Sequence, residues 1–342
     1  MVNGIYTLAN DVVYDQLVAL LNSIEANAGR EIPVCVIPYD DRLDQVKAEI
    51  ATRDNVTLFD DSASLARWEG IGTRIWKSHP RALKLWRERG LSDNFRIERH
   101  RKLCCLDGAF DKFIFFDADT LLMKPLDDVY EKLDRYDWIT NDFQYKSKLT
   151  YIFEWSEEKL QETFQRQSIR NDIFCSGWFA SKKSIFDQVT LNQLLDKLES
   201  GESDVLAWGD SDQTVINYLV LRSGISYYNY ACHDEATGCH WSSQFNVVDN
   251  ILYDQGQPIT YLHYMSVSSS AFTQLCTGED VNIAYRDVFL HYRYLKSPEQ
   301  RPQSFNRPSP FVQLQRNGSK FLQKKFNRLK LKYSNFKDKI TQ

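Results

Sequence analysis

Short apolar runs alternate with amphipathic segments at the start of the chain. The runs at residues 4–9, 32–38 and 55–59 are bounded by turn-forming residues, which is the pattern of buried strands. Between them, apolar residues recur on one face of a predicted helix around 17–24, and residues 44–51 predict a second helix. Strand, helix, strand, helix, strand at this spacing indicates an α/β unit with a parallel sheet. Ligands of such sheets bind outside the carboxyl ends of the strands.

The same alternation continues through the middle of the chain. Residues 113–116 (FIFF) form an apolar strand that ends in Asp117-Ala118-Asp119. Two more strands are expected, at 137–141 and 173–180. Helices are expected over the ranges 62–94, 95–109, 126–136, 151–170, 189–200 and 212–222. The pattern therefore predicts a large α/β domain.

Composition narrows the class of protein. Of 342 residues, 43% are hydrophobic and 26% are charged, which is typical of a globular chain and not of a disordered or fibrous one. The formal net charge is −4, but residues 311–342 carry nine Lys and Arg against one acid, which leaves the rest of the chain at −12. The acidic body argues against nucleic acid as the main partner, and the basic tail predicts a partner of its own.

The cysteines and the first residues indicate a reduced compartment. The seven cysteines are an odd number with no CxxC pair, unlike a secreted disulfide framework. The start of the chain lacks the regions of a signal peptide, and no apolar run is long enough to span a membrane. We therefore expect a cytoplasmic protein. Cys232-His233 and Cys239-His240 raise the alternative of a zinc site, but their spacing favours buried thiols.

Asp117 and Asp119 are the strongest chemical signal. They lie one residue apart at the carboxyl end of a buried strand, so both carboxylates can approach one divalent cation. Hard cations such as Mg²⁺ and Mn²⁺ prefer oxygen ligands and bridge carboxylates to phosphate oxygens. The alternative is a turn that happens to contain two aspartates.

Five segments in a fixed order extend this signal over about 260 residues. They are TLANDVVY (7–14), RKLCCLDGAFDKFIFFDADTLLMKPLDDVY (101–130), FCSGWFASKK (174–183), GDSDQTVIN (209–217) and YLHYMS (261–266). Together they resemble the motifs of GT-A glycosyltransferases, in particular the retaining glycosyltransferase family 8, which includes glycogenin and bacterial lipopolysaccharide galactosyltransferases. The resemblance implies a Rossmann-like GT-A fold with a mixed, mostly parallel central sheet flanked by helices.

The resemblance also implies ligands and residue roles. Asp117, Asp119 and His263 would hold Mn²⁺ or Mg²⁺, and mixed imidazole and carboxylate ligation suits Mn²⁺ better. A nucleotide-sugar, with a UDP-sugar favoured, would lie against Lys102 and the central residue of the aspartate motif, Ala118. Its base and ribose would contact Thr7, Leu8, Ala9, Asn10, Asp11 and Tyr14.

The same resemblance implies a reaction centre. Asp212 and Gln213 would face the donor sugar, with Asp210 as a neighbouring candidate, and Asp142 would bind sugar hydroxyls. Helix capping is the alternative role for Asp212, as it is for the pair Asn10-Asp11. The basic side chains Arg99 and Arg101 would lie near the donor or on a solvated face.

Two departures from the family pattern bear on the donor site. Cys175 stands where the family has an asparagine, which leaves the identity of the donor sugar open. The segment after His263 reads YMSVSSSAF and lacks the usual Lys-Pro-Trp, so the lysine that would contact the diphosphate is missing. Hydroxyl or backbone N–H groups of the serines at 266, 268, 269 and 270 are possible substitutes.

Three regions are expected along the chain. Residues 1–295 form the GT-A domain, 296–315 a proline-containing linker and 316–342 a basic amphipathic helix. Leu322, Phe326, Leu329, Tyr333 and Phe336 form one apolar stripe on that helix. We expect residues 320–337 to bind an anionic membrane surface, which would place the protein peripherally on the inner face of a membrane. Docking on the acidic body and a disordered tail are the alternatives.

The predicted function is metal-dependent transfer of a hexose from a nucleotide-sugar to a hydroxyl on a glycan, lipid or small-molecule acceptor, with retention implied by the resemblance. A catalytically degenerate fold that acts as a membrane-associated scaffold is one alternative. A sugar-phosphate nucleotidyltransferase is disfavoured, because TLANDVVYDQ lacks the Gly-rich, basic loop that such enzymes need after their first strand.

Overall fold

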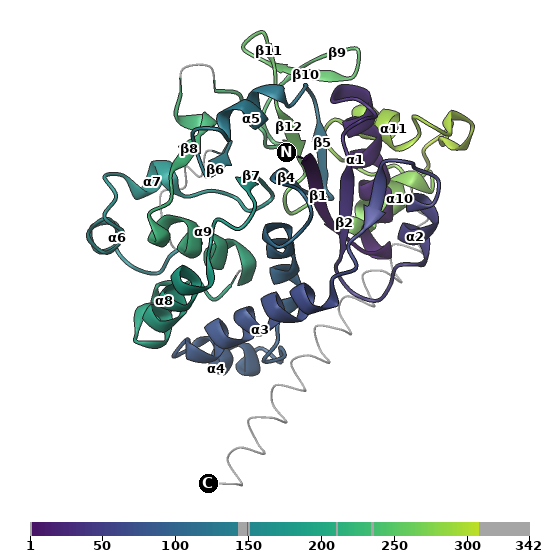
Figure 1. The fold of residues 1–342 in the computed structure, drawn as a ribbon. Helices are drawn as coiled ribbons and strands as arrows, with labels where there is room; N and C mark the ends of the chain where they lie inside the picture. Colours follow the sequence, from purple (N-terminus) through teal and green to yellow (C-terminus); the bar gives the residue numbers. More distant parts are fainter. Residues whose placement is uncertain (1, 143–148, 150, 210, 234–235, 308–342) are drawn as a thin grey trace, which may run out of the picture.

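The computed structural model describes residues 2–307 except 143–148, 150, 210 and 234–235 (Figure 1). A seven-stranded sheet forms its centre, in the order β3-β2-β1-β4-β7-β6-β8. The strands are β1 (Asn3–Ala9), β2 (Val34–Pro38), β3 (Val56–Leu58), β4 (Lys112–Asp117), β6 (Trp138–Thr140), β7 (Trp178–Lys182) and β8 (Tyr227–Asn229). Only β7 runs antiparallel to its neighbours, so the sheet is mixed and mostly parallel, as predicted.

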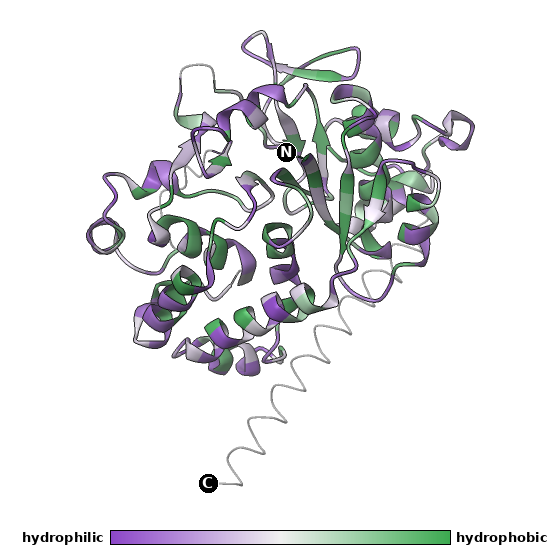
Figure 2. Ribbon diagram, in the orientation of Figure 1, coloured by the Kyte–Doolittle hydropathy of each residue, from purple (hydrophilic) through white to green (hydrophobic). Residues whose placement is uncertain are grey.

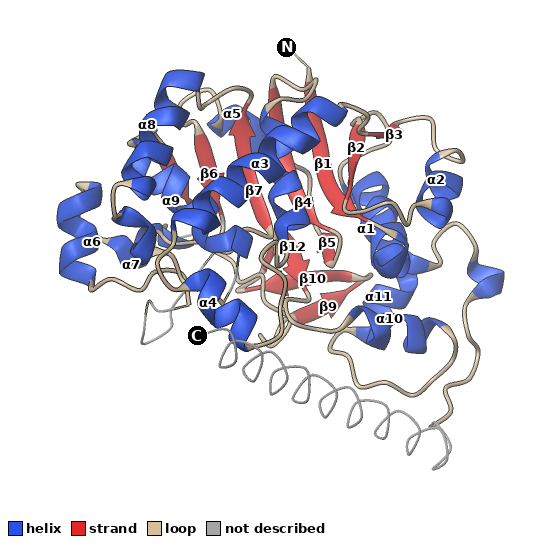
Figure 3. Ribbon diagram, turned by 90° about the horizontal axis from the view of Figure 1, so that it is seen from below, coloured by secondary structure: helices blue, strands red, loops and turns tan. Residues whose placement is uncertain are grey.

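Helices cover both faces of the sheet (Figure 3). Ile5, Val36 and Ile114 point to the face covered by α1 (Tyr14–Asn27), α2 (Asp44–Ile50) and α5 (Asp127–Lys132). Tyr6 and Phe115, one position along their strands, point to the opposite face. Because successive strand residues face opposite sides, a strand that is buried on both faces is apolar throughout. Figure 2 shows this apolar centre under polar outer helix faces.

The second face carries more helices. They are α3 (Ser62–Ser78), α4 (Ala82–Glu88), the 3₁₀ helix η2 (Ile97–Leu106), α6 (Glu157–Phe164), α7 (Ile169–Asp172), α8 (Gln188–Glu199) and α9 (Ser211–Ser223). Helix α6 begins late in the predicted range 151–170, because Ser156 caps it by accepting a hydrogen bond from the N–H of Lys159.

The C-terminal part of the described chain forms a third layer next to the central sheet. Strand β12 (Tyr261–His263) pairs antiparallel with β5 (Thr120–Leu122), which directly follows the aspartate motif. Its neighbours are a small sheet of β9 (Asn246–Val248), β10 (Ile251–Asp254) and β11 (Gln257–Pro258), and the helices α10 (Ser269–Cys276) and α11 (Arg286–Arg293). The pairing of β12 with β5 places His263 opposite Thr120, beside Asp119.

The prediction of a strand over 173–180 is wrong for its first five residues, since β7 begins at Trp178. The backbone N–H and C=O of Phe174 bond to the side chain of Asn217 and not to a strand. The N–H of Cys175 donates to the carboxylate of Asp142. Side chains thus replace the ladder hydrogen bonds where this segment approaches the site.

The C-terminal part of the chain is described up to residue 307. Residues 296–307 contain the short 3₁₀ helix η5 (Pro298–Gln300), and Asn306 exchanges backbone hydrogen bonds with Gly278 and Asp280. The rest of the predicted linker and the predicted basic helix lie outside the described residues. No helix within the described part is long and apolar enough to cross a membrane.

Candidate active site

A cavity of about 830 Å³ opens at the carboxyl ends of β1 and β4. Residues that line it come from widely separated parts of the chain: Leu8, Ala9, Asn10, Lys102, Asp117, Ala118, Asp119, Cys175, Ser176, Asp212, Gln213 and His263 are among them. Parallel strands bring their carboxyl ends to one edge, which explains why residues so distant in sequence meet there.

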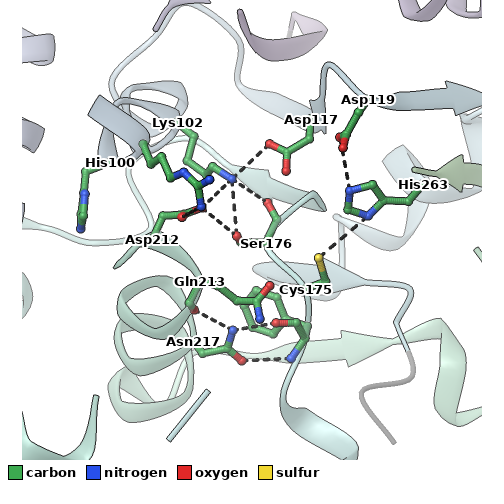
Figure 4. Close-up of polar contacts among 12 residues, drawn as sticks. His100, Lys102, Asp117, Asp119, Cys175, Ser176, Asp212, Gln213, Asn217 and His263 are labelled. Atoms are coloured by element: carbon green, nitrogen blue, oxygen red, sulfur yellow. Dashed lines mark hydrogen bonds and ion pairs between the residues drawn. The ribbon is translucent and has the colours of Figure 1, made fainter. Parts of the chain in front are cut away.

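Asp117, Asp119 and His263 form one cluster, here called the histidine side of the cavity (Figure 4). Asp117 ends β4, Asp119 lies in the turn to β5, and His263 ends β12. One ligand atom of each lies within 4.8 Å of the other two. His263 Nε2 is 3.3 Å from Asp119 Oδ1, and the hydroxyl of Thr120 closes the turn by donating to the carbonyl of Asp117 at 2.7 Å. Within the described residues, this is the only such group of three metal-ligating side chains.

The backbone beside the cluster leaves no room for a side chain. A Cβ atom at Gly177 would lie 2.4 Å from Cε1 of His263 and 3.0 Å from Oδ2 of Asp117. Only glycine therefore leaves both ligands where they are. Two carboxylates and an imidazole suit Mn²⁺, with open positions for phosphate oxygens.

The electrostatics of the histidine side also favour a cation. Burial raises the pKa of Asp117, and the charge of Asp119 adds to this while Lys102 opposes it. Burial has the same tendency at Asp119, but contact with His263 outweighs it and lowers the pKa of Asp119. Burial disfavours the charged imidazole of His263, yet Asp119 outweighs burial and raises its pKa. Two neighbouring carboxylates thus share one imidazole.

A second cluster, the lysine side, comprises Lys102, Asp212 and Ser176. Lys102 Nζ lies 2.8 Å from Asp212 Oδ2 and 3.1 Å from Asp117 Oδ1, and it also donates to the carbonyl of Ser176 at 3.3 Å. Burial opposes the charge on Lys102, but the two carboxylates outweigh it and raise its pKa. Burial likewise opposes the charge on Asp212, where Lys102 and then Arg99 lower the pKa. Lys102 therefore stays protonated and acts as a fixed positive charge.

The helix predicted over 212–222 is α9, whose first turn presents Asp212 and Gln213 to the cavity. The hydroxyl of Ser176 donates to Asp212 Oδ2 at 3.1 Å. One turn on, the Nδ2 of Asn217 donates to the carbonyl of Phe174 at 2.7 Å. Asp212 is thus an ion-pair partner inside the cavity, and the capping role considered for it is not needed to explain its position. Asp210, its neighbouring candidate, lies outside the described residues.

Asp142 and Cys175 lie next to each other at the base of the site. The Asp142 carboxylate accepts the backbone N–H of Cys175, and Asp142 is not among the cavity-lining residues. Cys175 does line the cavity, with Sγ 3.9 Å from Nδ1 of His263. Asp142 thus orders the segment that carries Cys175, and its binding of sugar hydroxyls stays a prediction.

The predicted base and ribose residues divide into two groups. Leu8, Ala9 and Asn10 line the cavity, whereas Thr7, Asp11 and Tyr14 do not. Thr7 is buried within β1. The Asp11 carboxylate accepts the N–H groups of Gln45 and Val46 and so caps α2. The Tyr14 hydroxyl donates to Glu49 at 3.1 Å.

Asn10 has both roles that the sequence left open. Its Oδ1 accepts the N–H of Val12 and so caps the 3₁₀ helix η1 (Asp11–Val13), while the residue also lines the cavity. The two basic candidates separate: Arg99 lines the cavity 3.4 Å from Asp212, whereas Arg101 pairs with Glu69 at 2.6 Å.

Several lining residues were not predicted, notably Tyr39, Arg42, Arg96 and Tyr151. Tyr39 directly follows β2, the neighbour of β1 in the sheet, so the rule that parallel strands end at a common edge would have identified it. Arg42 pairs with Asp40, which also accepts from Asn10. Such contacts between separate loops leave no periodic signal in the sequence.

The zinc alternative finds no support among the described residues. Cys232 is exposed and Cys239 is half-buried. His233 stacks on Tyr228, and Nδ1 of His240 contacts the hydroxyl of Ser242 at 2.7 Å. These side chains form no common group of metal ligands, and the thiol of Cys232 is not buried as expected.

No protein-family model matches the chain, and no curated protein matches it. Among solved structures, the galactosyltransferase LgtC, solved with donor and acceptor sugar analogs, is similar with a TM-score of 0.52 and 14% sequence identity, over 85% of this chain and 95% of LgtC. Mouse xyloside xylosyltransferase 1 gives a TM-score of 0.46 at 9% identity, over 66% of this chain and 84% of its own. The glycosyltransferase GlyE of Streptococcus pneumoniae TIGR4 gives 0.45 at 11% identity, over 86% and 60%.

The likeness to LgtC confirms the predicted fold. A seven-stranded, mostly parallel sheet with helices on both faces and an aspartate motif at the end of β4 is a GT-A-like arrangement.

Proposed function

We propose that this chain is a metal-dependent glycosyltransferase that moves a hexose from a nucleotide-sugar, with a UDP-sugar favoured, to a hydroxyl of a glycan, lipid or small-molecule acceptor, with retention. The observation that carries the proposal is the histidine side. Three ligating side chains from two distant parts of the chain meet within 4.8 Å, around a glycine that no other residue can replace without displacing them.

Asp117, Asp119 and His263 would hold Mn²⁺ or Mg²⁺ in this proposal. Once bound, the cation would neutralise the negative charge that grows on the nucleoside diphosphate as the glycosidic bond breaks. Leu8, Ala9 and Asn10 supply a wall at the end of β1 for the nucleoside.

The lysine side would orient the sugar. Asp212 is a carboxylate whose charge Lys102 secures, so it can accept hydrogen bonds from sugar hydroxyls without taking up a proton. Gln213 borders the same space and offers a carboxamide that is polar without being a strong nucleophile. Burial of Lys102 and Asp212 keeps water away from these contacts.

Hydrolysis of nucleotide-sugars tests the proposal directly. UDP-, GDP-, CMP- and TDP-sugars are incubated with the protein and Mn²⁺, and the released nucleotide is measured. We expect slow release from one donor, abolished by EDTA and by Asp119→Asn and retained in Asp128→Asn, which alters an exposed carboxylate on α5. Release from no donor, together with no Mn²⁺-dependent nucleotide binding, would instead identify the chain as a degenerate GT-A fold.

A further inference from the structure

The first turn of α10 opens onto the cavity. Ser266 and Ser269 line the cavity, and α10 begins at Ser269 after Ser268, whose side chain makes no capping hydrogen bond. Within the described residues, the backbone N–H groups of Ser269 and Ser270 have no acceptor, as is usual at the start of a helix. Exposed N–H groups and the positive end of the helix dipole both favour an anion in the adjacent space.

Gln16 gives an independent observation in the same part of the cavity. It lies on α1, which packs against α10, and its side chain lines the cavity although it is only 3% exposed. Its buried Oε1 has no hydrogen-bond partner in the described part of the chain. A buried polar group without a partner is costly, which points to a ligand that completes its hydrogen bonding. A half-turn of the carboxamide exchanges its oxygen and nitrogen, so Gln16 can donate an N–H.

Cationic side chains of the cavity are largely engaged elsewhere. Arg42 pairs with Asp40 at 2.5 Å, and both Arg99 and Lys102 pair with Asp212. Among the described residues, the donors on the side of the cavity formed by α1 and α10 are the backbone N–H groups of α10, the hydroxyls of Ser266 and Ser269, and the Gln16 carboxamide.

We infer that the first turn of α10 and the Gln16 carboxamide bind the diphosphate of the donor. This inference rests on the proposed function for the identity of the ligand, and it assigns to backbone and carboxamide donors a contact that a lysine side chain would otherwise make. Asp117, Asp119 and His263 would hold the cation that shares the same phosphate oxygens.

Inorganic pyrophosphate is the probe that tests the inference, because it carries neither base nor sugar. Its dissociation constant is measured by calorimetry with and without Mn²⁺ in the full chain and in Ser269→Pro. Proline is tolerated at the first position of a helix and removes one N–H, and Ser268 already has the extended φ of −69° and ψ of 140° that a following proline requires. Gln188→Pro is the matched control, since Gln188 is the first residue of α8, far from the cavity, and its N-cap residue, Asp187, has φ −68° and ψ 166°.

We expect Ser269→Pro to weaken pyrophosphate binding about tenfold and Gln188→Pro to change it less than about twofold, since one charge-assisted N–H bond is lost only in the first. Gln16→Glu keeps the shape of the side chain and places a negative charge against the anion, so a loss of at least tenfold is expected. Thermal unfolding confirms that each variant is folded.

Three results would overturn the inference: no binding of pyrophosphate by the wild-type chain, undiminished binding in both Ser269→Pro and Gln16→Glu, or an equal loss in Ser269→Ala, which would assign the contact to the hydroxyl. Its failure is separable from that of the proposed function. A chain that binds pyrophosphate through these groups but hydrolyses no donor retains the anion site without the transferase activity.

Discussion

The two sides of the cavity differ in how the negative charge of their aspartates is balanced. On the lysine side, Asp212 is 5% exposed and pairs with Lys102, which is 3% exposed, so the chain itself supplies the balancing charge. On the histidine side, Asp117 and Asp119 are 30% and 25% exposed; Asp119 pairs with the imidazole of His263, and Asp117 shares Lys102 with Asp212. Asp212 therefore has a buried cation of the same chain 2.8 Å away, whereas the more exposed histidine side is where the proposed function would have a cation bind from solution.

Asp119→Asn is expected to have the largest effect and to remove the function of the histidine side alone. Losing one ligand and its charge should reduce donor hydrolysis about a thousandfold, since a bound cation contributes several kcal/mol to transition-state stabilisation. In EDTA, the free energy of unfolding should change by less than about 1 kcal/mol, because the lost contact with His263 and the relieved repulsion from Asp117 oppose each other. Release of nucleotide from the donor and urea unfolding measure the two quantities.

The opposite result, a strong loss of stability, would contradict the difference between the histidine side and the lysine side. If Asp119→Asn destabilised the protein strongly in EDTA, the histidine side would be structural in the same sense as the lysine side. Asp128→Asn serves as the control, because Asp128 is 46% exposed, does not line the cavity, and contacts Lys124 and the hydroxyl of Tyr230.

Lys102→Met tests the lysine side. It leaves Asp212 and Asp117 without their shared cation, and breaking a buried ion pair from one end costs about 3–5 kcal/mol of unfolding free energy. The double variant Lys102→Met/Asp212→Asn should recover at least half of that loss, because the buried charge is then removed with its partner. Urea unfolding measures the free energy of unfolding of the single and double variants. If Lys102→Met were as stable as the wild type, the ion pair would contribute nothing to that free energy.

How much of these two sides the sequence predicted depends on how close together their residues lie in the chain. Asp117 and Asp119 were predicted because a buried strand and the motif that follows it are contiguous. His263 and Asp212 were reached only through the order of motifs shared with a family, since β12 and α9 are far from β4 in the chain. The pairing of Lys102 with Asp212 was not predicted, because it depends on how η2 and α9 pack.

The residues predicted to contact the base and ribose show what a local sequence pattern does not predict. Asn10, Asp11 and Tyr14 lie within one turn of chain between β1 and α1, and the sequence does not distinguish which of them face the cavity. The Asp11 carboxylate accepts a backbone hydrogen bond at the start of α2, and the Tyr14 hydroxyl donates a hydrogen bond to Glu49. Both partners come from a helix whose position only the folded sheet determines.

Gly177→Ala sharpens the comparison by altering the histidine side without changing its charge. The added Cβ would collide with His263 and crowd Asp117, so we expect a loss of about 1–3 kcal/mol in stability, as for other overpacked sites. Mn²⁺ affinity should fall by about tenfold or more, as it does when groups that orient metal ligands are disturbed. Gly70→Ala is the control, since a Cβ there would meet no atom within 4 Å. Unchanged Mn²⁺ affinity in Gly177→Ala would argue against a cation at this cluster.

The smallest expected effect concerns His100, which lies next to the lysine side. Its Nε2 accepts the indole N–H of Trp76 at 3.3 Å, and its Nδ1–H donates to the carbonyl of Ile97 at 3.1 Å, an arrangement that requires the neutral ring. Burial lowers the pKa of His100 below its ordinary value of 6.5.

The unfolded chain therefore binds a proton at His100 more readily than the folded chain does, so the stabilisation is fully present above pH 6.5 and is lost as the pH falls through the lowered pKa. The slope from this one proton is at most about 1.4 kcal/mol per pH unit. His100→Gln retains a donor and an acceptor without titrating, so its unfolding free energy, measured in urea and EDTA between pH 7.5 and 5, should depend less on pH than that of the wild type. Equal slopes in the two proteins would mean that protonation of His100 does not contribute to the pH dependence of the unfolding free energy.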